Sequence, residues 1–198
     1  MPRPDVSNQR KAKILEVARK IFAHKSLKDV KMQDIARKAG LSVGGVYWYY
    51  KSKEDILAAL LLQNAELNLA LIDRLIETSA PTAQRLKVIS EHFIEQVSQL
   101  SELYLTGAKY HARLSHIPET RMVMNRIDEG YRKSLAILIE QGISLGEFRS
   151  VNAKDVATIF ISAYEGLMLL WIMSPQTIQL KESARLTGQL LLTGLARE

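Results

Sequence analysis

The spacing of apolar residues constrains the fold of this chain more than any other feature. Apolar side chains recur three and four residues apart, and no segment alternates apolar and polar residues in the period-two pattern of a strand. Glycine and proline residues separate the periodic stretches, at Gly40, Pro81, Pro118, Gly146 and Pro175. The pattern therefore predicts an all-α protein of about nine helices.

One of the predicted helices is long enough to join two domains without a flexible linker. The expected helices cover residues 8–23, 32–39, 43–50, 52–78, 82–99, 102–116, 119–144, 153–174 and 176–196. The fourth of them connects a small N-terminal domain, residues 1–52, to a larger helical domain, residues 53–198.

Positive charge is concentrated at the start of the chain. The 198 residues carry a net charge of +6, but residues 1–53 hold 13 Lys and Arg against 4 Asp and Glu, a local charge of +9. The remaining residues carry a net charge of −3. A concentrated positive field favours a polyanion such as DNA, because each phosphate contact releases condensed counterions. A solubilising basic face is the alternative at this point.

Several classes of protein do not fit the sequence. The chain has no cysteine, which excludes disulfides, thiolate catalysis and Cys-ligated zinc. His111 and His116 lie roughly 140° apart around a helix that turns about 100° per residue, so they do not share a metal-binding face. No nucleophile motif, phosphate loop or dinucleotide fingerprint is present. We expect a non-enzyme without catalytic residues, metal or cofactor.

We recognise no targeting signal in the sequence. The opening MPRPDVSNQRKAK lacks the apolar core of a signal peptide. The longest apolar patch, around residues 167–173, is shorter than a membrane span. A cytoplasmic protein without a membrane partner is therefore expected.

Residues 32–50 carry the pattern of a helix-turn-helix, two short helices joined by a tight turn that contains glycine. Gly40 stands where the first helix ends, and Ser42 stands where the second is capped. Ile35 faces inward from the first helix, and Val46 anchors the second. The outer surface of the second helix is then formed by Val43, Gly44, Tyr47, Trp48 and Tyr49.

Such a second helix enters the DNA major groove with its N-terminus first. Its aromatic side chains can contact thymine methyl groups and phosphates, while Lys51 and Lys53 lie near the DNA backbone.

The residues around this motif resemble the DNA-binding domain of the TetR family of repressors. The resemblance covers about residues 10–57 and rests on Ile35-Ala36, Gly40, Ser42 and the run Tyr47-x-Tyr49-Tyr50-x-Ser52-Lys53-Glu54-x-x-Leu57. It implies a homodimeric, ligand-responsive transcriptional repressor whose larger domain binds a small molecule and dimerises through its last two helices.

The sequence departs from the family pattern at two places that bear on DNA contact. Lys31 stands where the family often has a capping Thr; Lys31 cannot cap, but it can reach a phosphate. Val43 and Gly44-Gly45 stand where many members have a Lys or Arg, which shifts sequence recognition toward the aromatic side chains, backbone contacts and DNA shape. The residues expected to contact DNA are Lys31, Met32, Gln33, Ser42, Val43, Gly44, Gly45, Tyr47, Trp48, Tyr49, Lys51 and Lys53.

The helix predicted at residues 153–174 is apolar on nearly every side. Such a helix in a soluble protein must be buried all round, so one face is expected to meet a second subunit. The last helix carries a matching stripe, although both helices could instead complete a monomeric core. The residues expected at the dimer interface are Ala157, Ile161, Leu186, Leu190, Leu191 and Gly194.

The larger domain also contains side chains suited to an effector pocket between the helices predicted at residues 82–99 and 153–174. They are large and either amphipathic or polarizable, although each alone is also an ordinary core residue. Because no Arg or Lys lies between residues 155 and 173, the expected effector is a neutral or cationic lipophilic molecule. The expected pocket residues are Tyr104, Tyr110, His111, Met124, Tyr131, Tyr164, Met168 and Trp171.

The function predicted from the sequence is a sequence-specific regulator, released from double-stranded operator DNA by a small-molecule effector. A regulator that activates, or that has no ligand, is the alternative among DNA-binding proteins. From another class, the alternative is a helical small-molecule-binding protein whose basic N-terminus docks a non-DNA partner.

Overall fold

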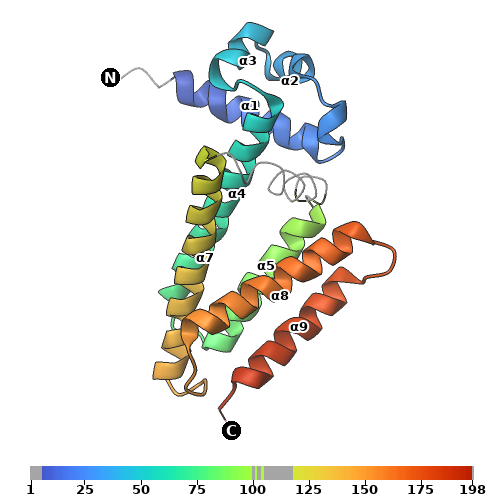
Figure 1. The fold of residues 1–198 in the computed structure, drawn as a ribbon. Helices are drawn as coiled ribbons and strands as arrows, with labels where there is room; N and C mark the ends of the chain where they lie inside the picture. The colour runs from blue at the N-terminus through green and yellow to red at the C-terminus, as the bar shows by residue number, and fades with distance from the viewer. Residues whose placement is uncertain (1–5, 100, 102–103, 105–117, 198) are drawn as a thin grey trace. The chain divides into compact units, whose positions relative to one another are not determined.

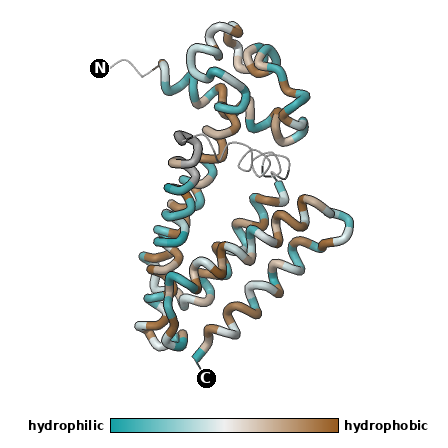
Figure 2. Tube along the Cα trace, viewed as in Figure 1, coloured by the Kyte–Doolittle hydropathy of each residue, from teal (hydrophilic) through white to brown (hydrophobic). Residues whose placement is uncertain are grey.

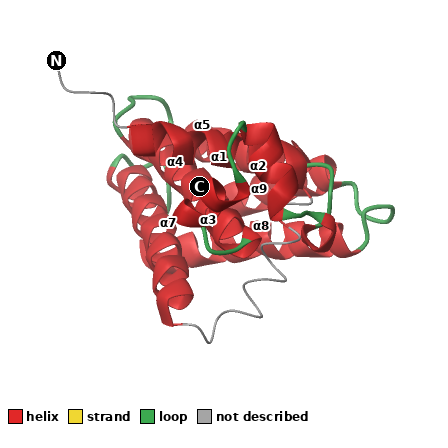
Figure 3. Ribbon diagram, turned by 90° about the horizontal axis from the view of Figure 1, so that it is seen from above, coloured by secondary structure: helices red, strands yellow, loops and turns green. Residues whose placement is uncertain are grey.

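The computed structural model describes residues 6–99, 101, 104 and 118–197, with backbone alone at residues 118–121, 123 and 124. The described residues form eight α-helices and one 3-10 turn, and Figure 3 shows no strand among them. The predicted all-α fold is confirmed, and the helix predicted at residues 102–116 lies outside the described residues except for Tyr104. In chain order (Figure 1) the elements are α1 Val6–Phe22, η1 Leu27–Asp29, α2 Met32–Ala39, α3 Val43–Tyr49, α4 Lys53–Ile76, α5 Thr82–Gln99, α7 Pro118–Ser144, α8 Ala153–Met173 and α9 Leu180–Leu195.

The described residues divide by packing into two compact units. The first contains residues 6–64 with Ser101 and Tyr104, and the second contains residues 65–99 and 118–197. The division falls within α4, beyond the boundary between residues 52 and 53 that we propose from the sequence. The reason is local: Ile56, Leu57 and Leu60, in the first turns of α4, are fully buried in the core of the first unit.

The core of the first unit follows the helical spacing of the sequence. Side chains three and four residues apart from α1, α2 and α4 meet around Val46 of α3, which is fully buried. This core holds the two short helices α2 and α3, which are below the length at which an isolated helix is stable in water. Its other members are Ile14, Val17, Ala18, Ile21, Phe22, Val30, Met32, Ile35, Ala36, Ile56, Leu57 and Leu60.

In the second unit α7 packs on α8, and α5 packs on both α7 and α9. The helices α8 and α9 also pack on each other, and both carry many hydrophobic positions (Figures 1 and 2). The helix α9 begins at Leu180 and not at residue 176, because Thr177 instead closes a turn by donating its backbone N–H to the Ser174 carbonyl. Pro175 in that turn lacks the N–H that a continuing helix would need.

Two helices, α4 and α8, are long and apolar enough to cross a membrane by length and composition alone. The expectation that no segment approaches a membrane span is therefore wrong by this criterion. The core helix of a soluble protein passes the same test. Among the described residues, only 17% of the apolar window of α8 is buried, so that helix leaves apolar surface uncovered.

Candidate functional site

The turn between α2 and α3 has the geometry that its sequence requires. Gly40 adopts a left-handed conformation, with φ 69° and ψ 30°, which glycine reaches without steric cost. Its backbone N–H and that of Leu41 satisfy the last carbonyl groups of α2. The chain can therefore leave α2 sharply and begin α3 after three residues.

The start of α3 is held by a side-chain cap. The Ser42 hydroxyl accepts a hydrogen bond from the Gly45 backbone N–H at 3.0 Å. A Cβ atom at residue 45 would lie 3.1 Å from that hydroxyl oxygen, so glycine leaves room for the cap. A Cβ at residue 44 would meet nothing within 4 Å, so that position presents open backbone at the surface of α3.

The face of α3 opposite Val46 is apolar, aromatic and exposed. Trp48 is 71% exposed and Tyr47 is 43% exposed, although side chains of this kind are ordinarily well buried. The Trp48 ring packs edge-on against that of the half-buried Tyr49, with centroids 4.9 Å apart. Gly44, Tyr47 and Trp48 share one side of the helix by their spacing, so α3 presents a surface suited to a partner.

At the start of α2, one expected DNA contact needs correction. Met32 is only 6% exposed, and its side chain belongs to the core, because residues 32, 35 and 36 lie on the same side of the helix. Only the backbone of Met32, in the first turn of α2, remains for a DNA contact. Lys31 and Gln33 are exposed on either side, and Lys31 makes no side-chain cap, as expected from the sequence.

Lys53 has a structural role that the sequence did not indicate. Its ammonium donates to the backbone carbonyls of Leu27 at 2.6 Å and Val30 at 3.1 Å, and more weakly to that of Lys28 at 3.5 Å. Lys53 therefore ties the start of α4 to η1. We assign it to positioning, while Lys51, which is exposed, stays a proposed phosphate contact.

Replacing Lys53 by methionine is expected to destabilise the first unit. The change removes charged hydrogen bonds to partly buried carbonyls, at a cost of about 1.5–3 kcal/mol. Thermal unfolding followed by circular dichroism measures this loss. Lys51→Met is the matched control, and equal melting temperatures for the two variants would contradict the assignment of Lys53.

The basic charge of the first unit is only partly neutralised within it. Lys13 and Lys20 bind Glu16, at 3.1 and 2.8 Å, and these two lysines hold the pKa of that carboxyl below its usual value. Arg37 binds Asp34. Among the described residues, other exposed cations of this unit make no ion pair, and they leave a net positive surface: Arg10, Lys11, Lys25, Lys28, Lys31, Lys38 and Lys51.

The helices α8 and α9 each expose an apolar stripe. On α8 the exposed polar residues Thr158, Ser162 and Glu165 lie among exposed apolar residues that follow helical spacing: Ile159, Gly166, Leu169, Leu170 and Met173. On α9, Leu190 is 64% exposed and Leu186 is 48% exposed, and Gly194 continues the stripe. Ile161 and Leu191 are half-buried at its edge.

The expectation that Ala157 lies at the dimer interface is corrected by its burial. Ala157 is fully buried within its own unit, together with Phe160 and Tyr164 on the inner side of α8. Ile159 and Leu170, which lie on the outer side, take its place in the proposed interface.

The residues expected to line an effector pocket are not gathered at one described cavity. Tyr110 and His111 lie outside the described residues, as does the side chain of Met124. Tyr164 is a core residue between α8 and α9, because its hydroxyl donates to the Ala184 carbonyl at 3.3 Å. Burial raises the pKa of Tyr164, which keeps that hydroxyl protonated.

For the four other expected pocket residues, a place in an effector pocket stays a prediction. The Tyr104 hydroxyl accepts a hydrogen bond from the Asn64 side chain at 2.8 Å, and the Tyr131 hydroxyl donates to the Ala65 carbonyl at 3.4 Å. Met168 and Trp171 are half-buried on α8.

Sequence reasoning missed a pair of buried amides on α4. Asn64 and Asn68 are 5% and 9% exposed, and the side-chain oxygen of Asn68 lies 3.0 Å from Nε2 of His92 on α5. Two asparagines four residues apart share one side of a helix, and this was a usable signal, since buried amides require polar partners. Asn68 and His92 therefore form a polar contact between α4 and α5 in the second unit.

Comparisons with known proteins agree with this architecture. The model of the family "Bacterial regulatory proteins, tetR family" matches residues 14–60. The HTH-type transcriptional repressor KstR2 of Mycolicibacterium smegmatis is 27% identical over 85% of this chain and 83% of its own length.

Two solved structures share the fold over nearly the whole chain. A putative transcriptional regulator from Saccharomonospora viridis, in complex with choline, has a TM-score of 0.82 at 20% identity and covers 96% of this chain and 100% of its own. The transcriptional regulator FadR from Bacillus subtilis, in complex with stearoyl-CoA, has a TM-score of 0.67 at 23% identity and covers 93% of this chain and 98% of its own.

Proposed function

Because the chain belongs to the TetR family of bacterial regulatory proteins, we propose that it is a repressor that binds operator DNA as a homodimer in the cytoplasm. A small-molecule effector releases it from that operator. The observation that carries the proposal is the exposed aromatic face of α3, presented by a capped helix next to unpaired positive charge. A tryptophan that is 71% exposed contributes little to a hydrophobic core, whereas on a recognition helix it can contact DNA.

On DNA, α3 lies in the major groove with its N-terminus leading. Tyr47 and Trp48 contact base edges and thymine methyl groups, while Lys31 and Lys51 bind phosphates. Since Gly44 and Gly45 offer no side-chain hydrogen bonds to bases, the shape and deformability of the operator contribute to its selection.

Two copies of the chain join through the exposed stripes of α8 and α9. Burying Leu170 and Leu190 of each copy removes apolar surface from water, at about 25 cal/mol per Å². A two-fold dimer presents its two recognition helices to half-sites about 34–36 Å apart, one turn of DNA.

The effector acts by favouring the state of the dimer that does not bind DNA. A ligand that prefers that state about a hundredfold weakens operator binding by about 2.7 kcal/mol. One of the two ligand-bound structures holds choline, a cation, and the other holds stearoyl-CoA, an acyl thioester that carries phosphates. Similarity of fold alone therefore does not identify the class of ligand. We retain a neutral or cationic lipophilic effector, since α8 has no Arg or Lys after its first turn.

The salt dependence of DNA binding tests the proposed function. Binding to operator is expected to weaken steeply between 50 and 200 mM salt, by roughly 10³-fold or more for six or more phosphate contacts. Lys51→Ala should weaken binding to all duplexes alike, and it should flatten the slope of log affinity against log salt by about one unit for each phosphate that the lysine neutralises. Fluorescence anisotropy measures both.

Lys181→Ala is the matched control, because Lys181 lies on α9 and binds Glu95 in the second unit. Affinity for duplex DNA that does not change with salt would contradict the proposal and favour a non-DNA partner for the basic domain.

A further inference from the structure

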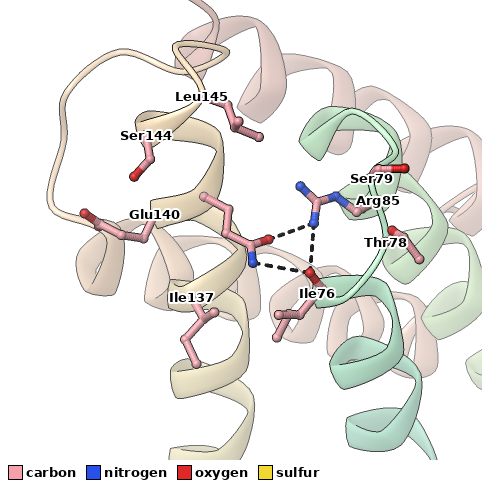
Figure 4. A pocket seen from close by; sticks show the side chains of 9 residues that line it. Ile76, Thr78, Ser79, Arg85, Ile137, Glu140, Ser144 and Leu145 are labelled. Carbon is pink, nitrogen blue, oxygen red and sulfur yellow. Dashed lines mark hydrogen bonds between the residues drawn. The ribbon is translucent and has the colours of Figure 1, made fainter.

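A surface pocket of about 500 Å³ lies wholly within the second unit. It is formed by the end of α4, the turn that follows, the first part of α5 and the last turns of α7, as Figure 4 shows. None of its residues is among those expected from the sequence to bind an effector. Its lining residues are Ile76, Thr78, Ser79, Arg85, Ile137, Glu140, Gln141, Ser144 and Leu145.

Arg85 is the unusual member of this lining, because it is a charged side chain that is only 3% exposed. Its Nη1 donates to the side-chain oxygen of Gln141 at 2.7 Å and to the carbonyls of Leu75 and Ile76 at 3.2 and 3.4 Å. Its Nη2 donates to the Thr82 hydroxyl at 2.8 Å. Figure 4 shows the bond from Arg85 to Ile76 beside the pocket.

Every one of these acceptors is neutral. Among the described residues Arg85 makes no ion pair, and its Nε is buried without a hydrogen-bond partner. The C-terminal carbonyls of α4 carry a partial negative charge and offset part of the cost of burying this cation. A buried guanidinium is nevertheless better satisfied by a carboxylate, because a carboxylate neutralises its charge as well as accepting its hydrogen bonds.

Two acidic side chains lie near Arg85, and neither is paired with it. The Glu147 carboxylate accepts from the Thr82 backbone N–H at 2.6 Å and so caps the start of α5. Glu140 is exposed on the lining of the pocket. Arg85 therefore lies on the lining of the pocket with no carboxylate partner among the described residues.

The other lining residues indicate the chemical character of a molecule that fits the pocket. Apolar surface is provided by Ile76, Ile137 and Leu145. Ile137 is 42% exposed and Leu145 is 68% exposed. Ser79 and Ser144 add hydroxyl groups. A water molecule occupies about 30 Å³ in the liquid. If each non-hydrogen atom of a ligand with its hydrogens takes about the same volume, the pocket holds a molecule of roughly fifteen non-hydrogen atoms or fewer.

We propose that this pocket is a small-molecule site for an organic carboxylate with a short apolar chain, whose head group binds Arg85. The apolar chain lies against Ile137 and Leu145. The site is separate from the effector pocket of the proposed function, and its existence does not depend on DNA binding.

The test uses the full-length protein without DNA and a six-carbon probe. Hexanoate is titrated by ligand-observed NMR, with 1-hexanol and hexylamine as neutral and cationic probes of equal chain length. Hexanoate is expected to bind at least about tenfold more tightly than either. Equal affinity for all three probes would overturn the proposal.

Substitutions then locate the binding. Ile137→Trp fills the pocket from a partly exposed position and should weaken hexanoate binding by at least about tenfold. Val88→Trp, at a position of α5 that is 38% exposed and outside the lining, is the matched control and should leave binding unchanged. Hexanoate binding that survives Ile137→Trp would place the carboxylate elsewhere and overturn the site.

The charge of the site is tested without disturbing the buried arginine. Glu140→Gln removes an exposed like charge and should strengthen hexanoate binding by about two- to fivefold, with no effect on 1-hexanol. An unchanged affinity would contradict an anionic head group at Arg85. Trp48→Ala should leave hexanoate binding intact, so that failure of this proposal and failure of DNA binding are distinguishable.

Discussion

Replacement of Trp48 by alanine is expected to abolish most of the sequence-specific DNA binding of this protein. The side chain is 71% exposed on α3 and buries its ring only when a partner covers it. An aromatic contact at a base edge contributes about 1–3 kcal/mol, and a dimer loses it twice. Operator affinity should therefore fall by about 30-fold to 20,000-fold.

The same change should leave the fold intact, because substitutions of exposed residues outside special sites change stability by less than about 0.5 kcal/mol. Leu67→Ala, at an apolar position of α4 that is 60% exposed, is the matched control. Anisotropy titrations at fixed salt, with circular dichroism on each variant, measure both effects. Unchanged operator affinity in Trp48→Ala would show that α3 is not the recognition surface.

Replacement of Leu190 by arginine is expected to separate the dimer. Leu190 is 64% exposed in the single chain, and the proposed interface would bury two arginines in place of two leucines. An unpaired buried charge costs about 3–5 kcal/mol, so the dissociation constant should rise by at least about 100-fold. Operator affinity should fall with it, since a monomer reads only one half-site.

Sedimentation equilibrium at micromolar concentration measures this loss. Met122→Arg is the matched control, because Met122 is 71% exposed on α7, outside the stripes of α8 and α9. If Leu190→Arg remains dimeric under conditions in which the control is dimeric, the interface lies elsewhere on the chain.

The parts of the site that depend on neighbours in sequence were predictable from the chain alone. Gly40 ends α2 and Ser42 caps α3 through bonds within four residues, so residue type and position were sufficient. The burial of Met32 was also accessible, because it shares the spacing of Ile35 and Ala36. The sequence interpretation nevertheless placed Met32 among the DNA contacts, whereas its side chain is buried in the core.

The parts that depend on distant neighbours were not predictable. The carbonyls that Lys53 binds lie 23 to 26 residues before it, and the Gln141 oxygen that Arg85 binds lies 56 residues after it. No local pattern encodes such pairings. The inner and outer sides of α8 were likewise indistinguishable, because an all-round apolar helix has no polar face to set its rotation, and Ala157 was placed on the wrong side.

Selection of bound fragments from a library of genomic DNA tests the central claim most directly. We expect enrichment of a near-palindromic sequence, with half-sites centred about 10 base pairs or a nearby multiple apart. Trp48→Ala should lose this enrichment, while Leu67→Ala should keep it. Recovery of fragments without a shared sequence, in proportions that the Trp48 substitution does not alter, would contradict a sequence-specific regulator.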